Sequence, residues 1–152
     1  MHVVLVEPEI PPNTGNIART CVMTGTKLHL IEPLGFSIDE KKVQRSGLDY
    51  WPYLDLEVHQ NYNAFKQAYD NARLLCFSTH GEDHYHRILY RPDDFLVFGS
   101  ETKGLSSEVL AKADHVLRVP MVEQIQRSLN LGNTVALVLY EALRQLTFPG
   151  MR

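Results

Sequence analysis

The sequence predicts an α/β fold with a parallel sheet, and three observations lead to this prediction. Short apolar runs rich in β-branched residues recur along the chain, and segments with helical spacing of apolar residues separate them. The length of 152 residues, 44% of them hydrophobic, suits one domain with one continuous core. Strands that alternate with helices imply right-handed crossovers and parallel strand pairing. We therefore expect a single domain over residues 1–152.

Five runs are expected to form the strands of this sheet. Each run is four to six residues long and almost continuously apolar, which is typical of strands that helices cover on both faces. The runs are residues 2–7, 28–32, 74–78, 95–99 and 116–119.

Three shorter helices are predicted between these runs. The first follows a proline-rich segment, and Asn13 is expected to cap it. The second carries its apolar residues between positions 64 and 69, with Asn61 or Asn63 as its cap. The third begins at Ser106, whose hydroxyl suits an N-cap.

The last predicted helix, residues 133–146, is apolar on nearly all sides as far as Glu141 and Arg144. A surface helix normally carries one apolar stripe. We expect one face to pack on the sheet and the other on a second copy of the chain, which predicts a homodimer through this C-terminal helix. The alternative is a helix enclosed within the monomer.

Composition and charge exclude several classes of protein. No apolar run approaches the roughly 20 residues that a membrane helix needs, and the carboxylate of Glu7 comes too early for a secretory signal. Cys21 and Cys76 are the only cysteines, which favours a reducing, cytoplasmic setting without a disulfide. The net charge of −3 argues against a protein that binds polyanions over its whole surface. Any nucleic-acid binding must therefore come from local basic patches.

Polar loops follow three of the five predicted strands, at the sheet edge where open α/β sheets bind ligands. In the first loop, Asn16 and Arg19 are three residues apart and share a helix face. A cation early in a helix opposes the macrodipole unless an anion is bound there. Arg19 is therefore either part of a phosphate or oxyanion site or a solvated surface residue. No G-x-G-x-x-G fingerprint is present.

The second loop, residues 97–106, is bracketed by Gly99 and Gly104 and is similar to a P-loop. Leu105 stands where the phosphate-binding lysine belongs, and Glu101 would repel a triphosphate, so an NTPase is disfavoured. Phe98 rules out a nucleophile elbow around Ser100. The loop either lets its backbone approach a ligand or is an ordinary turn.

The third loop, residues 119–134, carries Ser128, Asn130 and Asn133 before the apolar helix. These side chains are either caps and turn formers or hydrogen-bonding groups around a ligand. The segment from His80 to His86 lacks any zinc-ligand spacing, so we expect a solvated polar loop and no metal site.

Taken in order, the three loops resemble motifs one, two and three of the SPOUT class of RNA methyltransferases. Stretches elsewhere in the chain add to the resemblance, which is greatest to the single-domain tRNA 2′-O-methyltransferases of the wobble nucleotide; these stretches are residues 7–16, 31–36, 45–50, 127–131 and 140–146. The resemblance implies a C-terminal trefoil knot and a homodimer that completes each active site. It implies S-adenosylmethionine as cofactor without a metal, and the anticodon loop of tRNA, with leucine tRNAs expected, as substrate.

The resemblance also assigns residues. It implies cofactor contacts by Phe77, Gly99, Val119, Met121, Ser128 and Leu129. It links Arg19 to catalysis and lets Asn16, Glu101 and Asn130 shape the site. A ribose 2′-hydroxyl would attack the sulfonium methyl in line, and the permanently charged guanidinium of Arg19 would favour the alkoxide rather than act as a free base.

Two departures from the family pattern concern the substrate: Ser100 replaces a frequent proline and Lys103 a frequent arginine. Basic residues that can gather on one face for RNA are Lys41, Lys42, Arg45, Arg87, Arg91, Lys103 and Arg127. Three alternatives stay open: another tRNA or rRNA site as methyl acceptor, a non-catalytic RNA-binding module, and a small-molecule α/β enzyme.

Overall fold

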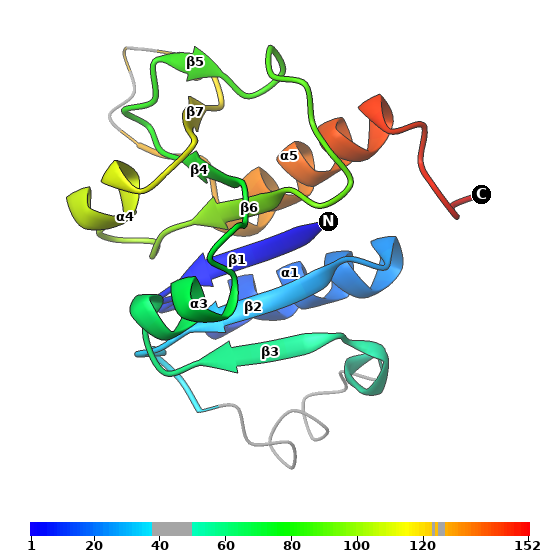
Figure 1. The fold of residues 1–152 in the computed structure, drawn as a ribbon, viewed down its shortest axis with the longest axis horizontal. Helices are drawn as coiled ribbons and strands as arrows, with labels where there is room; N and C mark the ends of the chain where they lie inside the picture. The colour runs from blue at the N-terminus through cyan, green and yellow to red at the C-terminus, as the bar shows by residue number, and fades with distance from the viewer. Residues whose placement is uncertain (38–49, 123, 125–126) are drawn as a thin grey trace.

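A seven-stranded sheet forms the centre of the computed structural model, which describes residues 1–37, 50–122, 124 and 127–152 (Figure 1). The strand order is β3-β2-β1-β6-β4-β7-β5, and every pairing is parallel. The strands are β1 (His2–Val6), β2 (Lys27–Ile31), β3 (Leu56–His59), β4 (Leu74–Phe77), β5 (Asp83–His84), β6 (Phe95–Phe98) and β7 (His115–Arg118). The predicted parallel α/β architecture is confirmed.

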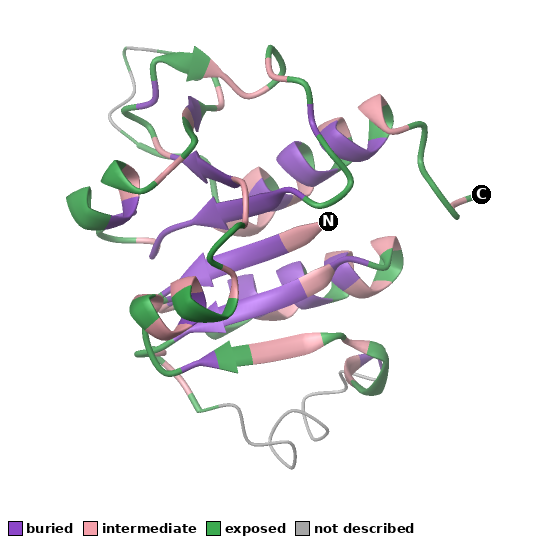
Figure 2. Cartoon of the chain, viewed as in Figure 1, coloured by how far each residue is buried: buried purple, intermediate pink, exposed green. Residues whose placement is uncertain are grey.

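Helices cover both faces of the sheet. They are α1 (Pro11–Thr24), the 3-10 turn η1 (Trp51–Tyr53), α3 (Tyr62–Ala68), α4 (Ser107–Ala111) and α5 (Leu131–Gln145). Helices α1 and α5 pack with the sheet in one apolar cluster, and α3 and α4 pack with it in a second cluster. Within β1, Leu5 belongs to the first cluster and Val4 to the second, so neighbouring residues bury opposite faces. Figure 2 shows the central strands buried, while β3 and β5 at the two edges are largely exposed or intermediate.

All five predicted strands are present, with ends that differ by at most one residue. Strands β3 and β5 were not predicted from the sequence. Strand β5 has only two residues, Asp83 and His84, and β3 carries Glu57 and an exposed Val58, so neither shows an apolar run. Edge strands are buried on fewer sides, and their sequences therefore lack the pattern of a covered strand.

Two of the predicted N-caps are confirmed and one is wrong. The side chains of Asn61 and Ser106 accept hydrogen bonds from the backbone N–H groups of residues 64 and 109, as expected for N-caps. The prediction that Asn13 caps α1 is wrong, because α1 begins at Pro11 with Ile10 at the N-cap and no side-chain cap bond. Proline has no N–H and its φ already suits a first helical turn, so the helix starts earlier without a polar cap.

Helix α5 begins at Leu131, two residues before the predicted start, and Asn130 caps it. Val135, Val138, Leu139, Ala142 and Leu143 are buried against the rest of the chain. On its other side Leu137 is 39% exposed and Tyr140 44% exposed, so the alternative of a helix enclosed within the monomer is wrong. Within the described ranges no helix is long and apolar enough to cross a membrane. The trefoil knot stays a prediction.

Candidate functional site

A cavity of about 430 Å³ lies at the carboxyl ends of β4, β6 and β7. These three strands are neighbours in the sheet, so the loops that follow them meet at one edge. Parallel α/β sheets bind their ligands at this edge, and small-molecule sites have volumes of about 300–1,000 Å³. The cavity therefore has the place and the size of a ligand site.

Two stacked aromatic rings line the inner part of the cavity. Phe77 and Phe98 end their strands as a register pair, with ring centroids 4.8 Å apart and planes inclined by 13°. Val119, Met121 and Leu129 add apolar side chains from the third loop. Apolar walls with a few polar groups are the usual lining of a small-molecule site. Sequence reasoning missed Phe98, although its position at the end of an apolar run next to a glycine marks it.

The loop after β6 folds back on itself and forms one wall. Ser100 and Gly104 form a β-bridge, and the carbonyl of Ser100 accepts a hydrogen bond from the N–H of Gly104 at 2.9 Å. A Cβ on Gly99 would lie 2.1 Å from the carbonyl carbon of Gly104, far inside any contact distance. The closed loop therefore requires glycine at position 99, and its backbone borders the cavity directly.

Reciprocal hydrogen bonds join this loop to the loop after β1. The Glu101 carboxylate accepts from the backbone N–H of Glu9 at 2.8 Å and of Ile10 at 3.2 Å. In return the Glu9 carboxylate accepts from the backbone N–H of Thr102 at 3.2 Å and from its hydroxyl at 2.7 Å. Charged acceptors make these bonds stronger than neutral ones, so they fix the two loops against each other.

Asn13 connects all three polar loops through its side chain. It is buried, its amide nitrogen donates to Glu101 at 2.9 Å, and its amide oxygen accepts from the side-chain nitrogen of Asn130 at 2.9 Å. Asn130 at the same time caps α5, accepting from the N–H of Asn133 at 3.2 Å. Sequence reasoning treated Asn13 only as a cap. Its place one helical turn before buried Ile17 is the signal that its side chain faces inward.

The structure brings together eight of the ten predicted site residues. All eight line the cavity: Phe77, Gly99, Glu101, Val119, Met121, Ser128, Leu129 and Asn130. His80 also lines it, so one end of the histidine-rich segment faces the same space. Their roles in binding and catalysis stay predictions.

Asn16 and Arg19 do not line the cavity of their own chain. Both are exposed on α1, and the Arg19 guanidinium lies over the ring of Tyr50, 4.9 Å from its centroid. The hydroxyl of Tyr50 donates to the carbonyl of Gly15 at 2.7 Å, which ties the ring to the same helix. The predicted catalytic arginine is thus positioned by a cation–π contact outside the cavity.

The basic residues expected to meet RNA are exposed where the structure describes them. Arg87, Arg91, Lys103 and Arg127 are exposed, and Lys103 lines the cavity. Lys41, Lys42 and Arg45 lie outside the described residues, as does most of the stretch 45–50 that contributes to the family resemblance.

Comparisons with a family model and with known relatives point to the same family. Residues 1–140 match the model described as SpoU rRNA Methylase family. A relative from Burkholderia ambifaria, named tRNA (cytidine(34)-2'-O)-methyltransferase, is 49% identical over 152 residues, which covers 98% of this chain and 97% of the relative.

Solved structures agree with the sequence relatives. One described as "Structural insights into the 2-OH methylation of C/U34 on tRNA" has 48% identity and a TM-score of 0.89, covering 96% of this chain and 95% of that one. The SpoU methyltransferase AviRb from Streptomyces viridochromogenes, solved in complex with the cofactor AdoMet, has a TM-score of 0.84 at 24% identity, covering 97% of this chain and 60% of that one. At that identity AviRb shows a shared fold alone.

Proposed function

This chain belongs to the SpoU rRNA methylase family, and we propose that it methylates the ribose 2′-oxygen of nucleotide 34, the wobble position of tRNA, with S-adenosylmethionine as methyl donor. The observation that carries the proposal is the relative of 49% identity, matched along nearly the whole of both chains and named for this reaction. The chain has the three motif loops around one cavity that such a reaction needs.

The cavity fits the methyl donor in chemistry as well as size. Phe77 and Phe98 offer flat apolar surface for an aromatic base, and Ser128 offers a hydroxyl. We assign cofactor contacts to the six predicted residues Phe77, Gly99, Val119, Met121, Ser128 and Leu129. When bound, S-adenosylmethionine supplies an electrophilic methyl group on sulfur, and no metal is needed for its transfer.

Arg19 carries the catalytic charge in this proposal. A guanidinium stays protonated, so it favours the alkoxide form of the attacking ribose oxygen, directly or by holding an adjacent phosphate. The contact with Tyr50 holds the group in place. Asn16 lies one turn from Arg19 on the same exposed face and can hydrogen-bond the same substrate.

A second copy of the chain completes the site. Arg19 and Asn16 lie outside the cavity of their own chain, while α1 and α5 pack together and leave Leu137 and Tyr140 of α5 exposed. Dimerisation through α5 would cover these apolar side chains and bring α1 of one protomer to the cavity of its partner.

The substrate in this proposal is the anticodon loop of tRNA, with leucine tRNAs as the expected acceptors and the cytoplasm as the setting. Unpaired bases of a loop can be read by stacking and edge contacts. The exposed arginines and Lys103 supply the local positive charge that the net charge of −3 does not. The family description names rRNA, so rRNA is the competing acceptor.

The test is to incubate the pure protein with labelled S-adenosylmethionine and either total tRNA or rRNA, then to map the label by mass spectrometry. We expect a 2′-O-methyl group on nucleotide 34 of tRNA. Label in rRNA instead of tRNA would show that rRNA is the acceptor. RNA binding without label in either RNA would favour a non-catalytic RNA-binding module.

The matched variant is Arg19→Ala, with Lys112→Ala, at the exposed C-cap of α4, as the control. Removing a charge that stabilises a transition state costs about 100- to 1,000-fold in kcat. Arg19→Ala should lose kcat by this factor and keep cofactor affinity, because the cofactor contacts are assigned to six other residues. Near-normal turnover of both Arg19→Ala and Arg19→Lys would contradict the assigned role.

A further inference from the structure

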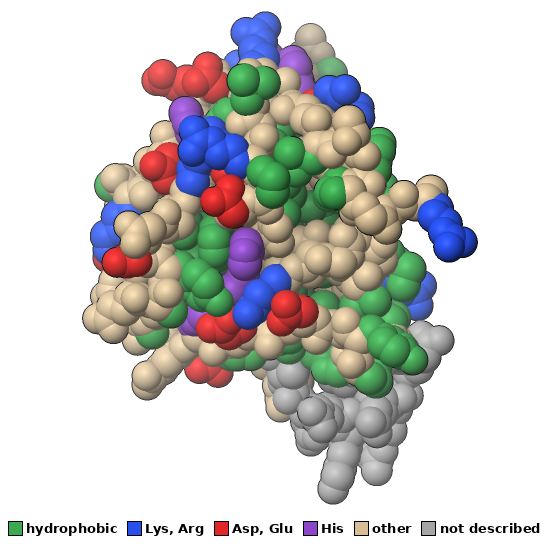
Figure 3. Space-filling view, turned by 45° about the vertical axis from the view of Figure 1, so that its right-hand side comes forward, with side chains coloured by type: hydrophobic (Ala, Val, Ile, Leu, Met, Phe, Trp, Pro, Cys, Tyr) green, Lys and Arg blue, Asp and Glu red, His purple; other side chains and the backbone are tan. Residues whose placement is uncertain are grey.

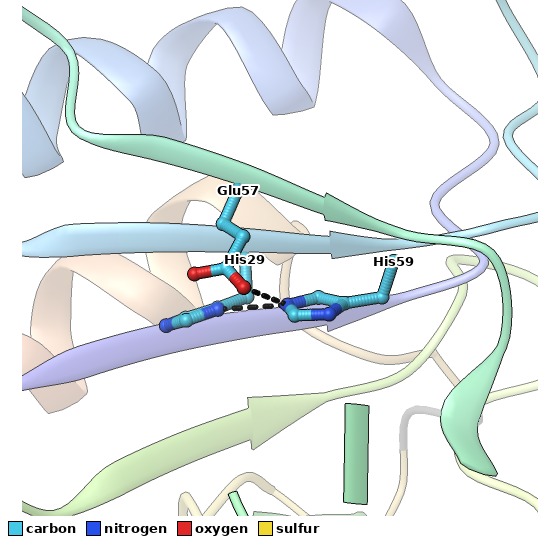
Figure 4. Close-up of side chains that lie close together, drawn as sticks. All are labelled: His29, Glu57 and His59. Atoms are coloured by element: carbon cyan, nitrogen blue, oxygen red, sulfur yellow. Dashed lines mark hydrogen bonds and ion pairs between the residues drawn. The ribbon is translucent and has the colours of Figure 1, made fainter. Parts of the chain in front are cut away.

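A second cluster of chemistry-bearing side chains lies on β2 and β3, away from the cavity. His29 comes from β2, and Glu57 and His59 come from β3; all three project toward one point on the same face of the sheet (Figure 4). His59 Nε2 is 3.0 Å from His29 Nδ1 and 3.7 Å from Glu57 Oε1. None of the three lines the cavity, so the cluster plays no part in the proposed methyl transfer.

Two of the three separations between the ligand atoms are close to those around one small divalent cation. The atoms all lie within 4.8 Å of one another. Tetrahedral zinc with bonds of about 2.0–2.1 Å places its ligand atoms about 3.3 Å apart, between the two distances that His59 makes. Two imidazoles and one carboxylate are a frequent donor set for zinc, and they leave a fourth position for water.

The remaining polar atoms of two of these side chains are held by neighbours. His29 Nε2 is 2.9 Å from Nδ1 of His2, and Glu57 Oε2 accepts from the Tyr69 hydroxyl at 2.6 Å and from the Lys27 ammonium at 2.9 Å. Metal ligands in proteins are oriented in this way by hydrogen bonds to the atom that does not bind the metal. The facing atoms therefore stay directed at their common point.

His29 Nδ1, His59 Nε2 and one Glu57 oxygen can each direct a lone pair at one point. Glu57 Oε2 already accepts hydrogen bonds from Tyr69 and Lys27, so Oε1 is the oxygen that faces His59. Without an ion, one proton on His29 Nδ1 or on His59 Nε2 makes a single hydrogen bond between the two rings, and Glu57 Oε1, 3.7 Å from His59 Nε2, lies beyond hydrogen-bond distance. One cation would accept all three lone pairs.

The surroundings favour a bound ion and allow its entry. Phe65 and Tyr69 of the α3 segment lie edge-on to the rings of His29 and His59, with centroids 5.0 to 6.0 Å apart. Such an apolar shell strengthens interactions with a charge. The Glu57 side chain is 35% exposed, which opens the cluster to solvent at the edge of the sheet. Figure 3 shows histidine side chains beside acidic and basic ones on one face of the molecule, whereas His29 and His59 themselves are buried.

We propose that His29, Glu57 and His59 bind one Zn²⁺ ion, which clips the edge strand β3 to β2. The ion would link β3, which lies at the edge of the sheet and pairs on one side only, to its neighbour β2. Sequence reasoning predicted no metal site because it searched for ligands at short spacing. His29 and His59 are 30 residues apart in the chain and meet only through strand pairing.

The experiment uses untagged protein freed of metal with a chelator. Zn²⁺ is added in a calorimetric titration, and Co²⁺ is added as a spectroscopic probe of the ligand set. We expect one ion per chain, visible d–d bands of a four- or five-coordinate Co²⁺ with nitrogen ligands, and a higher Tm with Zn²⁺ than without it. The absence of saturable binding at one ion per chain would overturn the proposal.

Two ligand variants and one control locate the ion. Glu57→Gln and His59→Gln should each weaken Zn²⁺ binding at least tenfold and abolish the rise in Tm, while His84→Gln combined with His86→Gln should change neither. Binding that survives both ligand variants, or that disappears in the control, would overturn the assignment. Circular dichroism of each metal-free variant checks folding, and the Co²⁺ spectrum of the unchanged protein tests the ligand set even if a variant fails to fold.

Discussion

Gly99 illustrates how one residue controls the shape of the cavity. A side chain at this position would collide with the backbone of Gly104 rather than with a movable side chain. The loop after β6 can therefore close only with glycine at this point. Gly15 offers a contrast inside α1, because a Cβ there would meet only the Tyr50 hydroxyl at an ordinary 3.9 Å.

We expect Gly99→Ala to lower the free energy of unfolding by about 1–3 kcal/mol or more, since the loop must open to relieve the overlap. Gly15→Ala should be neutral or stabilising by up to about 1 kcal/mol, because alanine is the better helix former. Urea unfolding of both variants measures the difference. Equal stability of the two variants would show that the loop is not closed as described.

Glu101 acts on the backbone of the first loop. Both of its carboxylate oxygens accept hydrogen bonds from residues 9, 10 and 13, so the charge is already directed at its own chain. In the proposed enzyme this places Glu101 as a positioning residue that holds the motif loops around the cavity.

Glu101→Gln should destabilise the protein by about 1–3 kcal/mol, because its NH₂ group would face a backbone N–H and leave that donor without a partner. The control is Glu108→Gln, which removes an exposed ion pair with Lys112 and should cost about 0.5 kcal/mol or less. Denaturant melts compare the two variants. A loss as small as that of Glu108→Gln would mean that the loop contacts contribute little.

At the scale of elements, α5 has two apolar faces, one buried in its own chain and one exposed. One face is buried against the sheet and α1, and the other exposes Leu137 and Tyr140. Phe148, just after the helix, lies beside Tyr140 with ring centroids 6.5 Å apart and extends this apolar surface. A second copy of the chain is the partner that the proposed function requires.

Leu137→Asp should raise the dissociation constant of the dimer about a hundredfold or more, because the interface would bury an unpaired charge. Leu89→Asp is the matched control, since Leu89 is 82% exposed and lies outside α5. Light scattering over a concentration series measures both. A monomeric unchanged protein, or a Leu137→Asp variant as dimeric as the control, would rule out this interface.

At the scale of the whole molecule, the sheet lies between the two apolar clusters and contributes one face to each of them. Cys21 belongs to the cluster beneath α1 and α5, and Cys76 belongs to the cluster beneath α3 and α4. Both thiols are buried, and burial raises the pKa of each to about 12. Thiolate is the reactive form, so neither thiol should react in the native state at pH 8.

We expect both thiols to become reactive over the same urea transition, because a single domain unfolds cooperatively. A chromogenic disulfide reagent applied to Cys21→Ala and Cys76→Ala, each with one remaining thiol, reports the two faces separately. The midpoints should coincide once each is compared with the unfolding of the same variant. Exposure of one thiol well before global unfolding would show that the two layers unfold separately.

The sequence by itself determined the layers of the fold and the composition of the cavity. Periodicity is local, so buried strands such as residues 74–77 and 95–98 were visible as apolar runs, and polar loops after them marked the functional edge. The short edge strands β3 and β5 lacked this signal because one or both of their faces meet solvent.

Only the tertiary structure decided which distant residues meet. Asn13 reaches partners 88 and 117 residues away, and His29 meets His59 across 30 residues. Arg19, assigned to the site by motif, lies outside its own cavity. These contacts depend on the strand order β3-β2-β1-β6-β4-β7-β5. Local periodicity does not specify that order, because it fixes which face a residue presents and not which strand lies next to it.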